Sequence, residues 1–438
     1  MASARPLRRC AAWVRLSDAR YVSPLAERLA DDVLARFLRY VVIDTQSALE
    51  SSTYPSTAKQ LNLSRLLVEE LREIGLDDVV LTEHGYVLAT LPGTVAETPT
   101  VALVAHVDTS TEAPGGPVRA AVHRNWAGAP IVLAGDPSQV LDPARIPALA
   151  ARVGHDLITS DGTTLLGADD KAGVAEIMAA AAHLVGDPAP RATLRLVFTV
   201  DEEVGAGTEH LDLDMLGADV AYTFDGSGLG ELELETFSAV ELALTVTGVS
   251  VHPGYAKGLL VNALKLLADV VAALPRDRFS PETTEGREGY VHPTRIAGTS
   301  TEATLWWIVR DHDDALLDEH VAVVRALAER IIGAEPRASF TLAVKEQYRN
   351  MRAVLDRYPE VAAAAEAAYR RVGLEPVHTI IRGGTDGAWL SARGLPTPNI
   401  FTGGQDYHSL REWASVQDMA AAAAVAVELA RVWGERGR

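Results

Sequence analysis

The sequence has little of three things that mark large classes of proteins. It contains one cysteine, Cys10, which excludes an intrachain disulfide framework and a cysteine-rich zinc site. No apolar run approaches the ~18 residues of a membrane-spanning helix. Acidic residues outnumber basic ones by 59 to 40, so the chain lacks the basic footprint that nucleic acids and anionic membranes require. We therefore expect neither as a partner, and any metal must be held by His, Asp and Glu side chains.

The length of 438 residues is more than one hydrophobic core usually serves, so the sequence predicts two domains. Residues 1–20 are rich in arginine and have no sustained apolar segment, which is unlike a secretory signal. We expect residues 1–25 to form a disordered or extra N-terminal arm. We expect the protein to be cytoplasmic.

Acidic and histidine side chains follow a series of expected strands. Strands are expected at 101–105, 194–200 and 219–224, and each is followed by polar residues. The continuous apolar run 101–105 is typical of a strand buried on both faces, and 194–200 is expected to be buried as well. In open α/β sheets, ligands bind outside the carboxyl ends of the strands. One such cluster would usually be a solvated loop, but several from one alternating region predict an anionic pocket. The side chains are His106, Asp108, Glu202, Glu203 and Asp225.

A fourth cluster, Asp169 and Asp170, lies between glycines at the start of an expected helix. On its own it is explained as well by a capped helix with an acidic first turn. Beside the other clusters it favours two zinc-like ions, for which one carboxylate can serve as the bridge. Asp169, at the most constrained turn, is the natural bridge, and Asp108 suits the orientation of His106. Of the two adjacent glutamates, one can bind metal while the other moves a proton.

The pattern changes after about residue 234. Strands are expected at 239–247, 294–300, 303–309 and 339–344, with helices at 259–274 and 315–332. This β-α-β-β-α-β order matches a ferredoxin-like unit. We expect an α/β catalytic domain, formed by 26–235 and 346–438, into which a second domain, 236–345, is inserted. After the insertion, residues 352–371 are expected to form one helix.

Six segments carry a resemblance to a known family: 106–110, 165–173, 201–205, 251–258, 381–387 and 401–404. From about residue 30 to its end, the chain resembles the co-catalytic dinuclear zinc exopeptidases. The last three segments resemble the tripeptide aminopeptidases of that family in particular. The resemblance implies a central mixed sheet with helices on both faces, an inserted ferredoxin-like lid, and two Zn²⁺ ions per chain. It also implies a homodimer formed through the lid.

The resemblance further implies a role for each site residue. Asp169 would bridge the two ions through a turn with a cis peptide bond at Asp169–Asp170. Glu202 would be the general base and acid, and Asp108 would orient a histidine. The other metal ligands would be His106 and Asp225 for one ion, and Glu203 and His408 for the second.

Four residues are expected at the substrate: His252, Asn262, Arg310 and Arg382. Three of them, His252, Arg310 and Arg382, each have a plain alternative in the sequence. His252 precedes a proline and would shape a turn, while Arg310 would pair with a neighbouring aspartate. Arg382 would form a structural salt bridge.

The expected activity is release of the N-terminal residue from tripeptides. Two alternatives stay open. Another amide hydrolase of the family, such as a dipeptidase or an aminoacylase, would share the chemistry and differ in its pocket. A non-catalytic peptide-binding relative would normally have lost a ligand or the base, whereas every position is present here.

Overall fold

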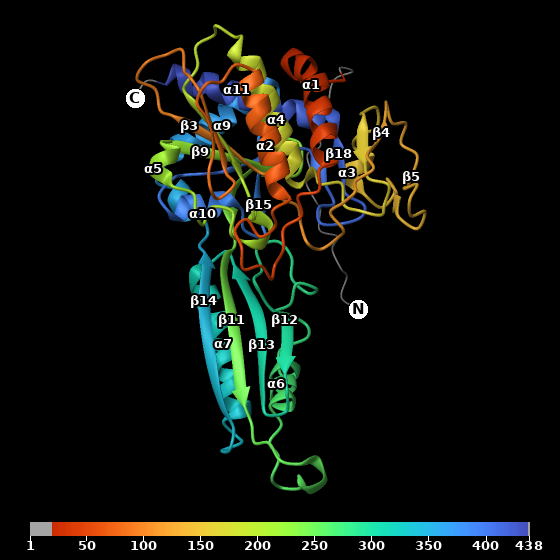
Figure 1. Cartoon of the computed structure of the whole chain (residues 1–438), viewed down its shortest axis with the longest axis vertical. Coiled ribbons are helices and arrows are strands. Elements are labelled where there is room, and N and C mark those ends of the chain that lie inside the picture. Colours follow the sequence, from red (N-terminus) through yellow and green to blue (C-terminus); the bar gives the residue numbers. More distant parts are fainter. Residues whose placement is uncertain (1–19, 437–438) are drawn as a thin grey trace, which may run out of the picture.

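The computed structural model describes residues 20–436, so most of the expected N-terminal arm lies outside the described residues. Figure 1 shows a rounded upper part and an elongated lower part. An eight-stranded sheet forms the centre of the upper part. Its strands, in spatial order, are β1 (Val79–Leu81), β2 (Val87–Leu91), β8 (Leu194–Thr199), β3 (Val101–His106), β9 (Val220–Gly226), β16 (Asn399–Phe401), β10 (Glu231–Thr236) and β15 (Val377–Ile381).

Neighbouring residues of β9 show that helices cover both faces of this sheet. The Tyr222 hydroxyl donates to the carbonyl of Val361 in α9 (Pro359–Val372) and accepts from Trp433 in α11 (Val416–Glu435). Thr223 points to the opposite face because side chains alternate along a strand. On that face Thr223 packs closely against α10 (Asp386–Ala392). A Cβ atom added to Gly387 of this helix would lie only 3.2 Å from the Thr223 hydroxyl. Since β3 pairs in parallel with β8 and β9 while β1 and β2 pair antiparallel, the expected mixed α/β sheet is confirmed.

The remaining elements of the upper part surround this core. Helix α4 packs on β3 and β9 and contacts α1 and α11. A small sheet, in the order β17-β18-β7-β4, joins the segment after β3 to the segment before α11. The elements are α1 (Pro24–Val41), α2 (Gln60–Glu73), α3 (Pro147–Ala150), α4 (Ala168–Val185), α5 (Leu213–Leu216), α8 (Arg352–Leu355), β4 (Ala121–His123), β5 (Ile131–Val132), β6 (Val140–Leu141), β7 (Leu157–Thr159), β17 (Gly404–Gln405) and β18 (Trp413–Ser415).

The lower part has its own sheet and its own core. Along the chain it contains β11 (Ser238–Thr247), α6 (Ala263–Ala272), β12 (Tyr290–Gly298), β13 (Glu302–Asp311), α7 (Asp314–Ile332) and β14 (Ser339–Tyr348). This is the expected β-α-β-β-α-β order. The sheet order is β12-β13-β11-β14, and Trp307 and Leu242 lie buried where α6 and α7 cover it.

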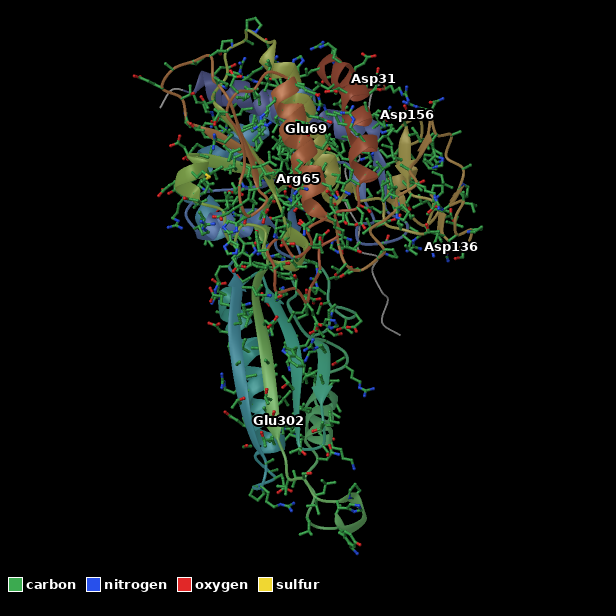
Figure 2. All side chains as sticks on the ribbon, viewed as in Figure 1. Asp31, Arg65, Glu69, Asp136, Asp156 and Glu302 are labelled. Carbon is green, nitrogen blue, oxygen red and sulfur yellow. The ribbon has the colours of Figure 1, made fainter. Side chains whose placement is uncertain are left out.

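The strands of the lower part run along the length of the molecule, away from the upper sheet. At the near end Ala239 pairs with Arg310, and at the far end Thr247 pairs with Glu302. Figure 2 labels Glu302 well down the lower part. At ~3.3 Å per residue the two ends of β11 lie roughly 30 Å apart. The segment that directly follows Thr247, before α6, is therefore remote from the upper part.

One expectation about secondary structure was wrong, and one strand was not expected at all. The helix expected over 352–371 is interrupted between α8 and α9, where Tyr358 has φ −127° and ψ 59°. Tyr358 precedes Pro359, and the proline ring disfavours the helical region for the residue before it. Strand β10 was not expected, because its alternating Glu and Leu residues look half-exposed, whereas it pairs with both β15 and β16. Within 20–436 no helix is long and apolar enough to cross a membrane.

Candidate dinuclear metal site

The end of β3 supplies a buried histidine with both ring nitrogens engaged. His106 Nδ1 lies 3.1 Å from the carbonyl oxygen of Asp108 and 3.4 Å from its carboxylate. Nε2 lies 3.0 Å from Asp169 Oδ1. Burial lowers the pKa of His106, but the hydrogen bonds to Asp108 and Asp169 outweigh it and raise the pKa well above its usual range. The ring is thus fixed with Nε2 directed at the acidic cluster.

The turn before α4 presents Asp169 to the same point. Gly167 has φ +80°, in the left-handed region that favours glycine, and the Asp169–Asp170 peptide bond is cis. The Asp170 carboxylate accepts from the backbone N–H of His106 at 3.1 Å and from that of Gly173 at 3.2 Å. Asp170 therefore ties the turn to β3, and Asp169 is left to face the cluster.

Asp108 also holds the acidic segment that follows β8. Its two carboxylate oxygens accept from the backbone N–H groups of Glu202 and Glu203, each at 3.1 Å. One buried aspartate thereby fixes His106 and both glutamates relative to each other. This explains how two strand ends far apart in the sequence keep a common geometry.

The five expected metal ligands form two groups of three. In each group the potential ligand atoms lie within 4.8 Å of one another, and Asp169 belongs to both. His106 Nε2 lies 3.6 Å from Asp225 Oδ1 in one group, and His408 Nε2 lies 2.9 Å from Glu203 Oε2 in the other. His408 also lies 3.2 Å from Asp169 Oδ2. Glu202 belongs to neither group, and its carboxylate comes to 3.9 Å from His106.

The charges of this cluster suit bound cations. Burial raises the pKa of Glu203 to about 8 and that of Asp225 to about 6, and the charge of Asp169 adds to both shifts. Burial also raises the pKa of Asp169, but hydrogen bonds to His106 and His408 hold it below its usual range. Glu203 Oε1 is buried and has no hydrogen-bond partner. Imidazole and carboxylate ligands, with one carboxylate shared, fit two zinc-like ions.

Of the four residues expected at the substrate, only Arg310 can be placed near the cluster. It stands at the near end of β13, where its guanidinium donates to the carbonyls of Val240 and Val309 and lies 5.7 Å from the centre of the Tyr348 ring. Burial raises the pKa of the Tyr348 hydroxyl to about 12; the charge of Arg310 opposes this rise and that of Glu202 adds to it, so both residues lie near the hydroxyl. Arg310 therefore does not form the surface ion pair with a neighbouring aspartate that the sequence left open.

His252 and Asn262 lie in the segment between β11 and α6, beyond the far end of the lower sheet. His252 is exposed and its Nδ1 accepts from the N–H of Gly254, while Asn262 caps α6 by accepting from Lys265. The structure does not bring either residue to the expected metal ligands of its own chain. Figure 1 shows this segment as a loop past the end of β11.

Arg382 joins the two parts of the molecule. Its guanidinium donates at 2.8 Å to the carbonyls of Gly286 and Glu288 and at 3.0 Å to the Thr284 hydroxyl. The same group lies 5.1 Å from the centre of the Phe237 ring. These contacts replace the salt bridge that the sequence left open, and they hold a loop of the lower part against β15.

Two buried acids of the site were not found from the sequence. Asp386 accepts from the Thr199 hydroxyl at 2.6 Å, and burial raises its pKa to about 7. Glu412 contacts the turn that carries Asp169, through backbone N–H groups. Asp386 lies inside a segment used for the resemblance, so a signal existed. Glu412 follows His408 by four residues and has no local pattern that marks it.

The chain is similar to known peptidases along its length. The sequence profile described as "Peptidase family M20/M25/M40" matches residues 160–432. A curated relative named Peptidase T, from Listeria monocytogenes, is 43% identical over 410 residues, which cover 93% of this chain and 100% of the relative. A Peptidase T from Bacillus licheniformis is 44% identical over the same shares. The crystal structure of a tripeptidase from Staphylococcus aureus superimposes with a TM-score of 0.72 at 22% identity and covers 93% of this chain and 99% of its own.

Proposed function

The chain belongs to peptidase family M20/M25/M40, and we propose that it is a dinuclear zinc aminopeptidase that releases the N-terminal residue of tripeptides. Membership confirms the resemblance that the six sequence segments indicated. Membership in this family makes the chain a peptidase. The metal, its count and the tripeptide preference are the parts we propose.

One observation carries the dinuclear site: Asp169 is the member common to both groups of potential ligands. Two separate mononuclear sites would need separate carboxylates, whereas a shared one holds two ions at the ~3.5–4 Å spacing of co-catalytic centres. Only His, Asp and Glu supply the donors, and zinc accepts both imidazole and carboxylate. We therefore assign His106 and Asp225 to one Zn²⁺, and Glu203 and His408 to the other.

Bound zinc would supply Lewis acidity and a nucleophilic water at neutral pH. Residues of the chain would transfer the proton, position the site and stabilise charge on the substrate. Glu202, which is free of both ligand groups, accepts the proton of the attacking water and donates it to the leaving amine. Asp108 fixes the positions of His106 and Glu202 relative to each other. Arg310 offers a buried positive charge to an oxygen of the substrate.

A panel of substrates of different length tests the proposal. We expect zinc-loaded enzyme to hydrolyse Ala-Ala-Ala with kcat/KM at least ~10²-fold above that for Ala-Ala, since an enzyme that recognises the length of a tripeptide leaves its polar contacts unpaired with a shorter one. N-acetyl-Ala-Ala-Ala, which lacks the free amine, is expected to be a poor substrate. Preference for Ala-Ala or for N-acetyl amino acids would instead favour a dipeptidase or an aminoacylase.

We propose that the lower part, 236–345 with β11 to β14, acts as a lid and mediates a homodimer. Two features support this. Strand β14 lies at an edge of the lower sheet, where its outer backbone groups can pair with a second chain, and it exposes the apolar side chain of Val344. His252 lies on an exposed loop too far from its own metal ligands to act there. In a dimer this loop would meet the site of the second copy, so each site would use His252 of the partner subunit.

Mixing two impaired variants tests the shared site. His252→Ala and Glu202→Gln are each expected to hydrolyse tripeptide poorly. Co-expressed in equal amounts, they are expected to recover about a quarter of wild-type activity, because half of the dimers are mixed and each of these has one intact site. Size-exclusion chromatography with light scattering measures the dimer. Activity of the mixture no greater than the mean of the two parents would contradict a shared site.

We also propose a cytoplasmic location. A chain with one cysteine gains nothing from an oxidising compartment, where disulfides are formed. Fractionation of cells that express the full chain would measure it.

A further inference from the structure

A buried glutamate lies beneath the turn that carries the shared ligand. Glu412 is 1% exposed, and its carboxylate makes three hydrogen bonds to backbone N–H groups. Oε2 accepts from Leu166 and from Gly167, both at 2.7 Å, and Oε1 accepts from Asp169 at 3.0 Å. A carboxylate that accepts several N–H bonds forms strong, charge-assisted contacts.

The N–H groups of Leu166, Gly167 and Asp169 need such a partner, because the Asp170 carboxylate of the same turn is engaged with His106 and Gly173 instead. The first N–H groups of a helix have no partner within the helix. Gly167, the residue before α4, has no side chain that could cap it, and Asp169 departs from helical geometry with φ −81° and ψ 104°. The regular hydrogen bonds of α4 therefore do not hold Asp169, and the contact from Glu412 takes their place.

Glu412 and His408 come from the same loop, between β17 and β18, and they meet Asp169 from two sides. His408 Nε2 lies 3.2 Å from the side chain of Asp169, while Glu412 holds its backbone N–H. We propose that Glu412 is a positioning residue for metal binding, which fixes the backbone of the 166–169 turn so that one Asp169 carboxylate serves both ions. The inference rests on the dinuclear site of the proposed function.

The test measures zinc binding to the full chain without substrate. Metal-free Glu412→Gln, titrated with Zn²⁺ against a chromophoric chelator, is expected to bind both ions about 10- to 100-fold more weakly than wild type, the size usual for residues that orient ligands. The amide keeps the shape of the side chain, but its NH₂ group would face a backbone N–H group. Because both groups are donors, at least one of the hydrogen bonds to the turn would be lost. Both affinities should fall together because Asp169 is common to both groups.

Glu176→Gln is the matched control. Glu176 is also a fully buried carboxylate, it belongs to α4, the helix that begins at the turn held by Glu412, and neither of its oxygens has a hydrogen-bond partner. Burial raises its pKa well above the usual range, so the neutral amide suits the site. This variant is expected to bind both ions with wild-type affinity. A loss equal to that of Glu412→Gln would assign the effect to general destabilisation and overturn the proposal.

Unchanged zinc affinities in Glu412→Gln, with a lowered melting temperature of the metal-free protein, would make Glu412 a purely structural cap and overturn the proposal. Weakening of only one ion would also overturn it. If Glu412→Gln fails to fold, Glu412→Asp is measured instead, since it keeps the charge but withdraws it by one methylene, and the same outcomes decide. Wild-type protein that binds two zinc ions but hydrolyses no peptide would refute the proposed function and leave this inference standing.

Discussion

Replacement of Glu202 by glutamine is expected to leave both metal ions bound and to lower kcat for tripeptide hydrolysis by about 10²- to 10⁴-fold, the range of a lost general acid–base. The reason lies in the contrast between two neighbours. Glu203 joins His408 and Asp169 in a group of potential ligands, whereas Glu202 belongs to none and stays within 3.9 Å of His106. A glutamine fills the same space but cannot accept the proton.

Glu203→Gln is the matched control for this experiment, since the two residues are adjacent and of one type. It is expected to lose metal as well as activity, while Glu202→Gln loses activity alone. Metal content by mass spectrometry and steady-state kinetics on the same samples separate the two effects. Wild-type turnover in Glu202→Gln would remove it from the mechanism.

The strand ends were the part of the site that the sequence could predict. The apolar run of β3 indicated a strand buried on both faces, and all six of its residues are buried. Parallel strands bring their carboxyl ends to one edge of a sheet, so His106, Glu203 and Asp225 converge whatever the loops between them do. The core of this sheet thus determines the positions of three potential ligands that lie far apart in the chain.

The contacts of Glu412, His252 and Arg382 depend on tertiary structure, and no local pattern reveals them. Glu412 contacts Asp169, which precedes it by 243 residues. The residues around His252 resemble an active-site segment, but the register of β11 with β13 puts them beyond the far end of the lower sheet. Arg382 meets carbonyls of a loop that only the packing of the two parts brings to it. Each position follows from how elements pack, which the spacing of residues does not encode.

Replacement of Asp169 by alanine is expected to abolish tight binding of both ions, because this carboxylate is the member common to the two ligand groups. Asp225→Ala removes the same side-chain type from one group only. It is expected to weaken one ion and to spare the ion held by Glu203 and His408. Loss of Asp169 also removes the negative charge that raises the pKa of both Glu203 and Asp225.

Isothermal titration of metal-free protein with Zn²⁺ distinguishes the two variants by stoichiometry. Wild type should bind about two ions per chain, Asp225→Ala about one with high affinity, and Asp169→Ala none. Circular dichroism of the metal-free samples shows whether the fold is retained, as expected when Asp170 and Glu412 still hold the turn. Two tightly bound ions in Asp169→Ala would mean that the sites are independent, because only a shared ligand makes the loss of one carboxylate cost both.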